Sequence, residues 1–293
     1  MTLNSLENTG CLVVQGPDRA GLVAKISTLL ARHDGNIVSL DQYSSDHRHG
    51  TFYQRVAFSC VSLEDSLPSI RDDLQKTMAP LSLKWRLVNL ARRKRIAILV
   101  SKSNYCLLDL LWQQQRGILP VTIPLVISNH QDNEQIVRGF GIPYFHVPTH
   151  NKNETESAIL ELLAGKIDLV VLARYMQILS RSFLEQIGVP IINIHHSFLP
   201  AFAGADPYGQ AKRRGVKLIG ATAHYVTEGL DEGPIIEQDV ARVTHALSVE
   251  ELRTIGGTIE RRVLSRAVLW HVQERVIQDK GQTIVFANSY AGE

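Results

Sequence analysis

The chain has 293 residues, of which 44% are hydrophobic and 20% charged, which suits a globular protein of two domains and excludes a disordered or fibrous chain. Its 31 basic and 29 acidic residues leave a net charge of +2, too balanced to indicate nucleic-acid binding. No run approaches the roughly 20 apolar residues of a membrane span, and the first residues lack the basic start and apolar centre of a signal peptide.

Residues 1–90 are predicted to form the first domain, in the order strand, helix, strand, strand, helix, strand. The predicted strands are Cys11–Gln15, Asn36–Tyr43, Thr51–Cys60 and Leu81–Val88, the last at a sheet edge, and the helices contain Leu22–Leu30 and Ser66–Met78. Asp18, in the turn after the first strand, is predicted to cap the first helix. This βαββαβ order indicates a ferredoxin-like fold.

Residues 91–293 are predicted to form the second domain, after a basic run, Arg92–Arg95, that we interpret as a solvated linker. Strands are predicted at Arg95–Val100, Ile123–Ser128, Ile142–Val147, Asp168–Ala173 and Pro190–Ile194, with helices at Leu107–Gln115, Glu154–Ala164 and Phe183–Ile187. A helix over Val249–Val276 and a strand over Thr283–Phe286 close the chain. We therefore expect a doubly wound, mostly parallel α/β domain, with functional groups at the carboxyl ends of its strands.

The most informative residues lie at one such strand end. Asn193 and His195 follow an apolar run and, being two apart on a strand, project to the same side. Asp231 follows in the segment Leu230–Pro234. An amide, an imidazole and a carboxylate together can polarise a carbonyl and move a proton, so these three are the candidate catalytic residues. An isolated Asn-x-His pair is more often a hydrogen-bonded strand end, and the surrounding motif is what favours catalysis.

Three segments carry a family resemblance. Asn193–Phe202, Gly220–Thr227 and Leu230–Ile236 resemble the signature of the folate-dependent formyltransferase superfamily, whose catalytic domain is Rossmann-like. Within it, His196, the run Val170–Ser180 and the domain in front make the chain most similar to the enzymes that deformylate 10-formyltetrahydrofolate. The resemblance covers nearly the full length.

The resemblance implies hydrolysis of 10-formyltetrahydrofolate to tetrahydrofolate and formate, in one-carbon metabolism and purine biosynthesis, without a metal or a redox cofactor. Asn193 would donate a hydrogen bond to the formyl oxygen, which His195 would also face. Asp231 would favour the protonated imidazole by its charge and relay the proton through water. Two other functions stay open, transfer of the formyl group to a small amine acceptor and a non-catalytic sensor.

A second set of residues matches the folate-binding side of the family's site. Tyr175, Met176, Gln177, Ile178 and Leu179 match the loop that accepts the pterin ring, and His224 matches a histidine near the triad. The structural alternatives are a turn packed by Met176 and Ile178, and a strand histidine with a structural hydrogen bond.

The turn after the first strand of the second domain bears on the acceptor. It reads Ser101–Tyr105 and has no glycine, whereas a related transferase carries a glycine-rich phosphate turn there, so the sequence favours water as the acceptor. The chain also departs from the deformylase pattern, which has histidine at Tyr105, lysine at Asp206 and histidine at Gly209, and differs after Gly256. These departures leave the rate and the substrate preference open.

The first domain resembles the ACT domain, a regulatory module that binds amino acids. The resemblance rests on Gly16–Gly21 and on Asn36-Ile37, and it implies Asp18, Gly21 and Asn36 as possible effector-binding residues. Alternatively, the domain only assembles subunits, with Gly21 allowing close packing of the helix. We expect a homo-oligomer in either case.

The three cysteines, Cys11, Cys60 and Cys106, are scattered through apolar segments without metal-ligand spacing. We therefore expect buried free thiols and a reducing, cytoplasmic environment.

Overall fold

The structure is a computed structural model that describes residues 6–46, 48–200 and 206–287. Its described residues form two compact units, one drawn from those within 6–93, 273–277 and 284–287, the other from those within 94–272 and 278–283. The roles that we assign to residues 1–90 and 91–293 stay predictions. No described helix is both long enough and apolar enough to cross a membrane.

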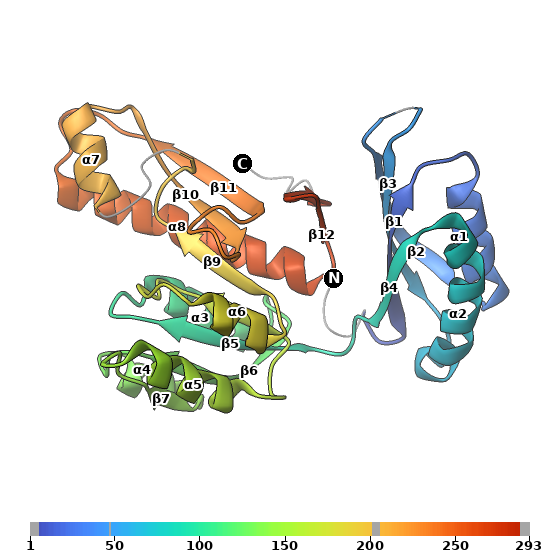
Figure 1. Ribbon diagram of the computed structural model, residues 1–293, viewed down its shortest axis with the longest axis horizontal. Coiled ribbons are helices and arrows are strands. Elements are labelled where there is room, and N and C mark those ends of the chain that lie inside the picture. Colours follow the sequence, from blue (N-terminus) through green and yellow to red (C-terminus); the bar gives the residue numbers. More distant parts are fainter. Residues whose placement is uncertain (1–5, 47, 201–205, 288–293) are drawn as a thin grey trace. The chain divides into compact units, whose positions relative to one another are not determined.

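The first unit contains a four-stranded antiparallel sheet (Figure 1). Its strands are β1 (Thr9–Pro17), β2 (Asn36–Ser44), β3 (Thr51–Ser59) and β4 (Lys84–Asn89), and its helices are α1 (Leu22–Arg32), α2 (Leu63–Met78) and the short 3-10 helix η2 (Ala79–Leu81). The strand order β2-β3-β1-β4 puts β4 at an edge, as predicted. The expected βαββαβ fold is therefore confirmed.

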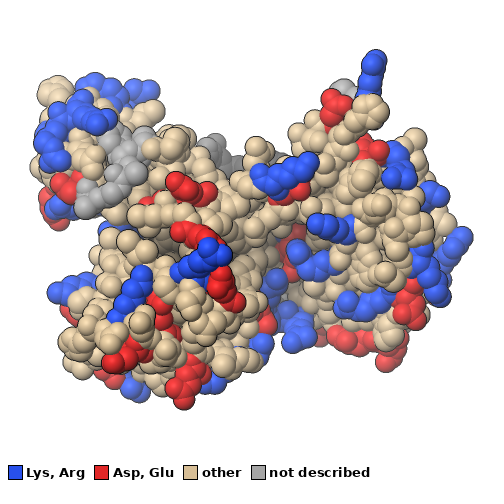
Figure 2. All heavy atoms as spheres, in the orientation of Figure 1, with Lys and Arg blue, Asp and Glu red and all other residues tan. Residues whose placement is uncertain are grey.

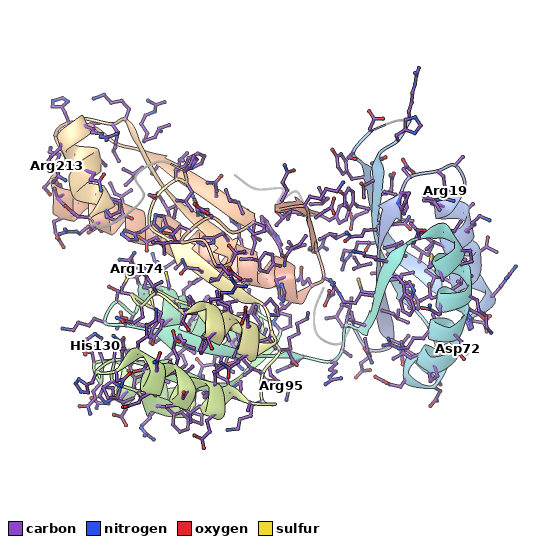
Figure 3. All side chains as sticks on the ribbon, viewed as in Figure 1. Arg19, Asp72, Arg95, His130, Arg174 and Arg213 are labelled. Carbon is purple, nitrogen blue, oxygen red and sulfur yellow. The ribbon has the colours of Figure 1, made fainter. Side chains whose placement is uncertain are left out.

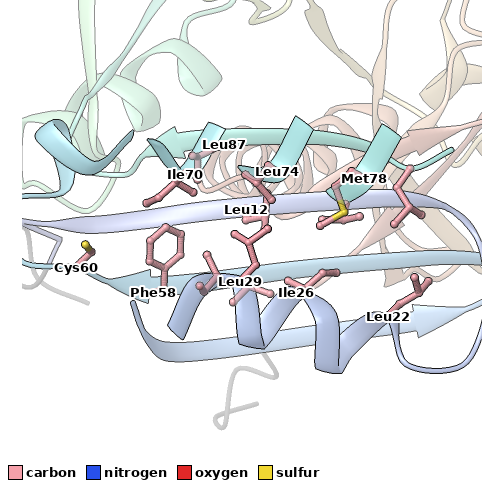
Figure 4. Packing of buried hydrophobic residues seen from close by; sticks show 14 of the residues in the cluster. Leu12, Leu22, Ile26, Leu29, Phe58, Cys60, Ile70, Leu74, Met78 and Leu87 are labelled. Atoms are coloured by element: carbon pink, nitrogen blue, oxygen red, sulfur yellow. The ribbon is translucent and has the colours of Figure 1, made fainter. Parts of the chain in front are cut away.

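The core of this unit lies between the sheet and its two helices. Leu12 from β1, Ile26 from α1, Phe58 from β3 and Leu74 from α2 are completely or almost completely buried in one apolar cluster (Figure 4). Helical spacing in α1 and α2 and alternation along the strands bring these side chains to a common layer.

The predicted cap of α1 is wrong. The helix begins at Leu22, its N-cap is Gly21 with φ 84°, and no side chain caps it. The Asp18 carboxylate instead accepts a hydrogen bond from the Ser44 hydroxyl at the end of β2. The N-cap position is Gly21, three residues after Asp18, and the Asp18 carboxylate is engaged at the end of β2 instead.

The second unit contains a seven-stranded sheet in the order β11-β10-β9-β8-β5-β6-β7. The strands are β5 (Lys94–Val100), β6 (Val121–Ser128), β7 (Tyr144–His146), β8 (Leu169–Leu172), β9 (Ile191–His195), β10 (Leu218–Tyr225) and β11 (Ile235–Arg242). The strands from β9 to β7 in this order run parallel, and β10 and β11 add antiparallel pairs. The expected doubly wound, mostly parallel domain is confirmed.

Helices cover both faces of this sheet (Figure 1). They are α3 (Tyr105–Gln115), α4 (Glu134–Gly139), α5 (Lys152–Leu163), α6 (Arg181–Ile187), α7 (Pro207–Arg214) and α8 (Val249–Val272). Ile159 of α5 and Phe183 of α6 pack with Leu99 and Val170 in the core of one face. Helix α8 packs against α3, β9, β10 and β11.

Two expectations at the borders of the second unit are wrong. Helix α8 ends at Val272 rather than at Val276, because Val276 opens β12 (Val276–Asp279), which pairs with β13 (Gln282–Val285). Arg95 is not part of a solvated linker. It lies in β5, and its guanidinium donates to Asp168 at 2.8 Å and to the Gly165 carbonyl at 3.0 Å.

Candidate active site

Strands β9 and β10 bring the candidate catalytic residues together. In their antiparallel register Asn193 lies opposite His224, and His195 lies opposite Thr222. Residues two apart on a strand share a face, so Asn193 and His195 on β9 meet His224 on β10. His195 and His224 are buried. The predicted projection of the Asn-x-His pair is therefore confirmed.

Asp231 completes the group from the loop between β10 and β11. Its Oδ2 lies 3.0 Å from His195 Nδ1, and its Oδ1 lies 3.5 Å from His224 Nε2. The hydrogen bond from His195 Nδ1, followed by the adjacent His224 ring, holds the pKa of the Asp231 carboxyl well below its usual value. Asp231 therefore stays ionised across the physiological range.

His224 orients the amide of Asn193. Its Nδ1 donates to the Tyr225 carbonyl at 2.9 Å, so in the neutral ring Nε2 accepts, and Asn193 Nδ2 lies 3.3 Å from it. Gly233 permits the close approach of its backbone to this pair, because a Cβ there would lie 1.7 Å from the Tyr225 carbonyl oxygen. One N–H of the Asn193 amide then remains for another acceptor.

His195 has one ring nitrogen engaged and one unused. Its Nε2 is buried and has no hydrogen-bond partner within the part of the chain that the structure describes. Buried polar atoms are normally paired, and their exceptions call for an explanation. Nε2 is therefore the atom of His195 that can exchange a proton with a bound substrate.

The predicted pterin loop, residues 175–179, is anchored at both ends. At the start, Met176 N donates to Ser101 Oγ at 3.0 Å, and Ser101 Oγ donates to Asn129 Oδ1 at 2.7 Å. At the other end, Ser180 N donates to Glu156 Oε1 at 2.7 Å. The sequence analysis did not predict the role of Glu156.

The middle of this loop is exposed. Met176 is 58% and Ile178 64% exposed, so the alternative that these two side chains pack the turn is wrong. Tyr175 and Leu179 face the apolar core of the unit, where burial raises the pKa of Tyr175 to about 12. The loop thus offers backbone groups and an apolar rim around Gln177, which is also exposed.

A second buried polar group, which the sequence analysis missed, lies beside the triad. We call Tyr105, Arg174, Tyr208 and Glu260 the Glu260 cluster. Tyr105 Oη donates to Glu260 Oε2 at 2.7 Å, and Tyr208 Oη donates to Glu260 Oε1 at 2.7 Å. A charged residue at position 260, among the buried apolar residues of α8, is the signal that could have revealed it. Figure 3 labels Arg174.

His196 connects the two polar groups. Its ring centroid lies 5.2 Å from that of His195 and 6.1 Å from that of Tyr208. Burial, followed by the charges of Arg174 and His195, lowers the pKa of His196 to about 3. His196 is therefore neutral, and it separates the triad from the Glu260 cluster as an uncharged spacer.

Two of the sequence departures belong to the start of α7. Asp206 is the N-cap of this helix and accepts from Gly209 N at 3.2 Å, so its acidic side chain has a structural task there. Lys212, Arg213 and Arg214 form the last turn of α7, and basic side chains gather at this end of the second unit (Figure 2). Arg213 Nη1 lies 3.7 Å from Asp206 Oδ2.

The possible effector residues do not form one site within a chain. Asp18 bonds to Ser44 at the last residue of β2, whereas Asn36 is the first residue of that strand. Gly21 has no heavy atom within 4 Å of an added Cβ, so its positive φ of 84°, rather than close packing, explains the glycine. Effector binding stays a prediction.

Cys11, Cys60 and Cys106 are free and buried, and burial raises the pKa of the Cys11 thiol to about 11. Among the described residues, no group of three or more His, Cys, Asp or Glu side chains is arranged to hold a metal ion.

Both parts of the chain match known families. Residues 94–268 match the formyl transferase family and residues 12–77 match the ACT domain. The chain is 54% identical over 280 residues to a formyltetrahydrofolate deformylase of Mycobacterium bovis, covering 94% of this chain and 90% of the relative. It is 47% identical to the same enzyme of Bacillus subtilis, over 96% and 94% of the two chains.

Solved structures give the same result and add a second class. A formyltetrahydrofolate deformylase from Pseudomonas syringae superposes with a TM-score of 0.91 at 42% identity, covering 95% of this chain and 94% of the other. A glycinamide ribonucleotide transformylase from Symbiobacterium toebii has a TM-score of 0.63 at 31% identity, covering 67% and 95%.

Proposed function

This chain belongs to the formyltetrahydrofolate deformylase family, and from this membership we propose that it hydrolyses 10-formyltetrahydrofolate to tetrahydrofolate and formate with Asn193, His195 and Asp231 as catalytic residues. The observation that carries the assignment of residues is the contact between His195 Nδ1 and Asp231 Oδ2 at 3.0 Å. This contact joins the last residue of β9 to a residue of the loop between β10 and β11.

The Asn193 amide stabilises the charge that develops on the formyl oxygen. His224 accepts one of its two N–H groups, which fixes the amide plane and leaves the other N–H to donate to that oxygen. A donor held in place before the reaction costs no reorganisation as the tetrahedral intermediate forms. His224 thus serves as a positioning residue.

His195 carries out the proton transfer. Asp231, whose pKa is held low by the histidines, is too weak a base for this step and instead orients the imidazole through Nδ1. Nε2 then faces the reacting group and transfers the proton directly. The sequence analysis instead expected Asp231 to relay the proton through water. Water adds to the formyl carbon, the bond from that carbon to N10 breaks, and N10 gains a proton.

The substrate's pterin ring occupies the loop at residues 175–179. The anchored ends and the exposed Met176 and Ile178 support this assignment, because an exposed apolar rim favours binding of a flat ring. The side chains of the triad supply the polarisation and the proton transfer, so the proposed reaction needs neither a metal nor a redox cofactor.

An initial-rate assay tests this function directly. With 10-formyltetrahydrofolate as the sole substrate, absorbance should report formation of tetrahydrofolate, and a separate assay should find formate in equal amount. Formate release no faster than the uncatalysed background would contradict the proposal.

The first unit is proposed to regulate or assemble the enzyme. Its match to the ACT domain supports ligand binding, with a free amino acid as the effector and a homo-oligomer as the assembly. The buried free thiols support a reducing cytoplasm. Initial rates with and without single free amino acids, and light scattering for the subunit number, test these points. A rate indifferent to every amino acid would contradict the effector role.

A further inference from the structure

The second unit has a switch point between β5 and β8. The chain runs from β5 outward to β6 and β7 and then returns to β8 on the other side of β5. In doubly wound folds, ligands bind in the crevice outside the carboxyl ends of the strands at this point. The two strand ends lie side by side here, since Ser101 N after β5 donates to the Arg174 carbonyl after β8 at 3.2 Å.

Side chains of the protein itself fill this part of the site. Tyr105 comes from the start of α3, directly after the β5 turn, and Arg174 follows β8. Both converge on Glu260, which is completely buried, and Arg174 Nε lies 3.4 Å from its Oε2. Tyr208, 6% exposed, engages the second carboxylate oxygen. Each Glu260 oxygen therefore already accepts a hydroxyl hydrogen bond.

The packing around the Glu260 cluster leaves little room. A Cβ at Gly256 would lie 1.9 Å from Tyr208 Oη, and one at Gly257 would lie 3.6 Å from the Tyr105 ring. A glycine inside the 24-residue helix α8 is unfavourable for helix stability, yet Gly256 lets the Tyr208 ring approach the helix, whereas a Cβ at Gly257 would meet the Tyr105 ring only at ordinary contact distance. The glycine of α8 at position 256 thus allows Tyr208 to fill the crevice.

The Glu260 cluster also flanks the reacting groups. A row of tilted rings from Tyr208 through His196 to His195 connects it to the triad with centroid distances of 6.1 and 5.2 Å. A second substrate approaching from the switch point would have to occupy the space that these side chains fill.

Proteins that share the fold of the second unit differ in the formyl acceptor that their names indicate. A glycinamide ribonucleotide transformylase shares the fold of the second unit at 31% identity, and its name includes a second substrate that is absent from the name of the deformylases. A common fold therefore serves two classes of formyl acceptor, and we expect the two classes of enzyme to differ at the ligand crevice.

We propose that the Glu260 cluster is the specificity determinant of this enzyme, filling the acceptor crevice so that water, and no amine, reaches the formyl carbon. This inference rests on the proposed hydrolysis. In transfer, an amine nitrogen would bond to the formyl carbon, the bond to N10 would break, and the proton lost by the amine would pass to N10. When the amine is excluded, water bonds to the formyl carbon instead, the bond to N10 breaks in the same way, and the product is formate.

Partition of the formyl group between water and an added amine tests this proposal. Wild-type enzyme turns over 10-formyltetrahydrofolate in the presence of glycinamide, and formate and N-formylglycinamide are quantified by mass spectrometry. Tyr105→Ala empties the space of one ring, whereas Tyr105→Phe keeps the ring and removes only its hydroxyl. We expect formylglycinamide at background for wild type and Tyr105→Phe, and an increase of about tenfold or more in its ratio to formate for Tyr105→Ala.

A second variant that empties part of the crevice keeps the proposal testable if Tyr105→Ala fails to fold. Arg174 has φ 64°, a conformation that glycine adopts without strain, and combining Arg174→Gly with Glu260→Gln avoids leaving a buried charge without its cation. This double variant should also raise the ratio. Formylglycinamide formed by the wild type, or an unchanged ratio in a folded variant that still releases formate, would overturn the inference. Absence of formate from the wild type would instead contradict the hydrolysis itself.

Discussion

The triad and the Glu260 cluster are two buried polar groups at the same end of one sheet, and they differ in what they leave unused. His195 keeps Nε2 without a partner among the described residues, and Asn193 keeps one amide N–H for a further acceptor. Glu260, by contrast, has both carboxylate oxygens engaged by tyrosine hydroxyls. This contrast holds for the Glu260 carboxylate and not for the whole cluster, because Arg174 Nε and Nη1 are buried without a hydrogen-bond partner among the described residues. The unused atoms of His195 and Asn193 are the ones that the proposed reaction engages.

The largest expected effect is on catalysis. Asp231→Asn should lower kcat by about 10²–10⁴-fold, because the neutral amide no longer fixes the imidazole of His195 for proton transfer. Product binding, measured by quenching of protein fluorescence with tetrahydrofolate, should stay close to wild type. The control is Glu232→Gln, an exposed neighbour in the same loop, which should retain its rate. Undiminished turnover by Asp231→Asn would show that the role of Asp231 is wrongly assigned.

Glu260→Ala should affect stability first. It leaves two tyrosine hydroxyls without their acceptor and the Arg174 guanidinium without its counter-charge, which typically costs about 3–5 kcal/mol in the free energy of unfolding. Urea unfolding measures this loss. Glu161→Ala on the exposed side of α5 is the control, with an expected change within about 0.5 kcal/mol. A loss from Glu260→Ala as small as that of the control would mean that the cluster is not a paired buried group.

The two glycines of α8 should respond in opposite directions. Gly256→Ala places a methyl group against Tyr208 and should destabilise the protein by about 1–3 kcal/mol. Gly257→Ala meets only ordinary van der Waals contact and should stabilise it by up to about 1 kcal/mol through helix propensity. Thermal unfolding of both variants checks the prediction, and equal shifts in Tm would refute the tight fit of Tyr208.

The smallest effect concerns His196, which lies between the two groups. With its pKa lowered to about 3, its ring should show no NMR titration between pH 5 and 8, with the signal assigned through His196→Gln. The unfolded chain takes up this proton near pH 6.5, so the contribution of His196 to stability falls as the pH drops below that value. A titration midpoint near 6.5 would mean that the ring is solvated.

Much of this fold could be predicted because the apolar runs are unambiguous. The run at β8 indicated a central strand, and the Asn-x-His spacing on β9 placed two catalytic candidates on one face. Strand β10 was missed because its glycine and alanines, such as Ala221 and Ala223, fit a position buried on both sides but carry no strand propensity. The Glu260 cluster could not be predicted, since its members come from α3, α7, α8 and the end of β8 and meet only in the folded domain.

In the first unit, a short motif predicted less than the apolar runs did. Asp18 and Gly21 matched a ligand-binding turn, but the structure uses Asp18 to bind Ser44 and Gly21 to adopt a positive φ. The motif thus located a turn but not the cap of the helix, and it leaves effector binding a prediction.

A double-mutant cycle on the rate of formate release tests the central claim most directly. We compare wild type, His195→Gln, Asp231→Asn and the double variant under the same conditions. If Asp231 acts only by holding His195, the double variant should be no slower than His195→Gln alone, because residues that act as one unit are strongly non-additive. Losses that multiply in the double variant would show that the two side chains act independently, and they would contradict this account of the site.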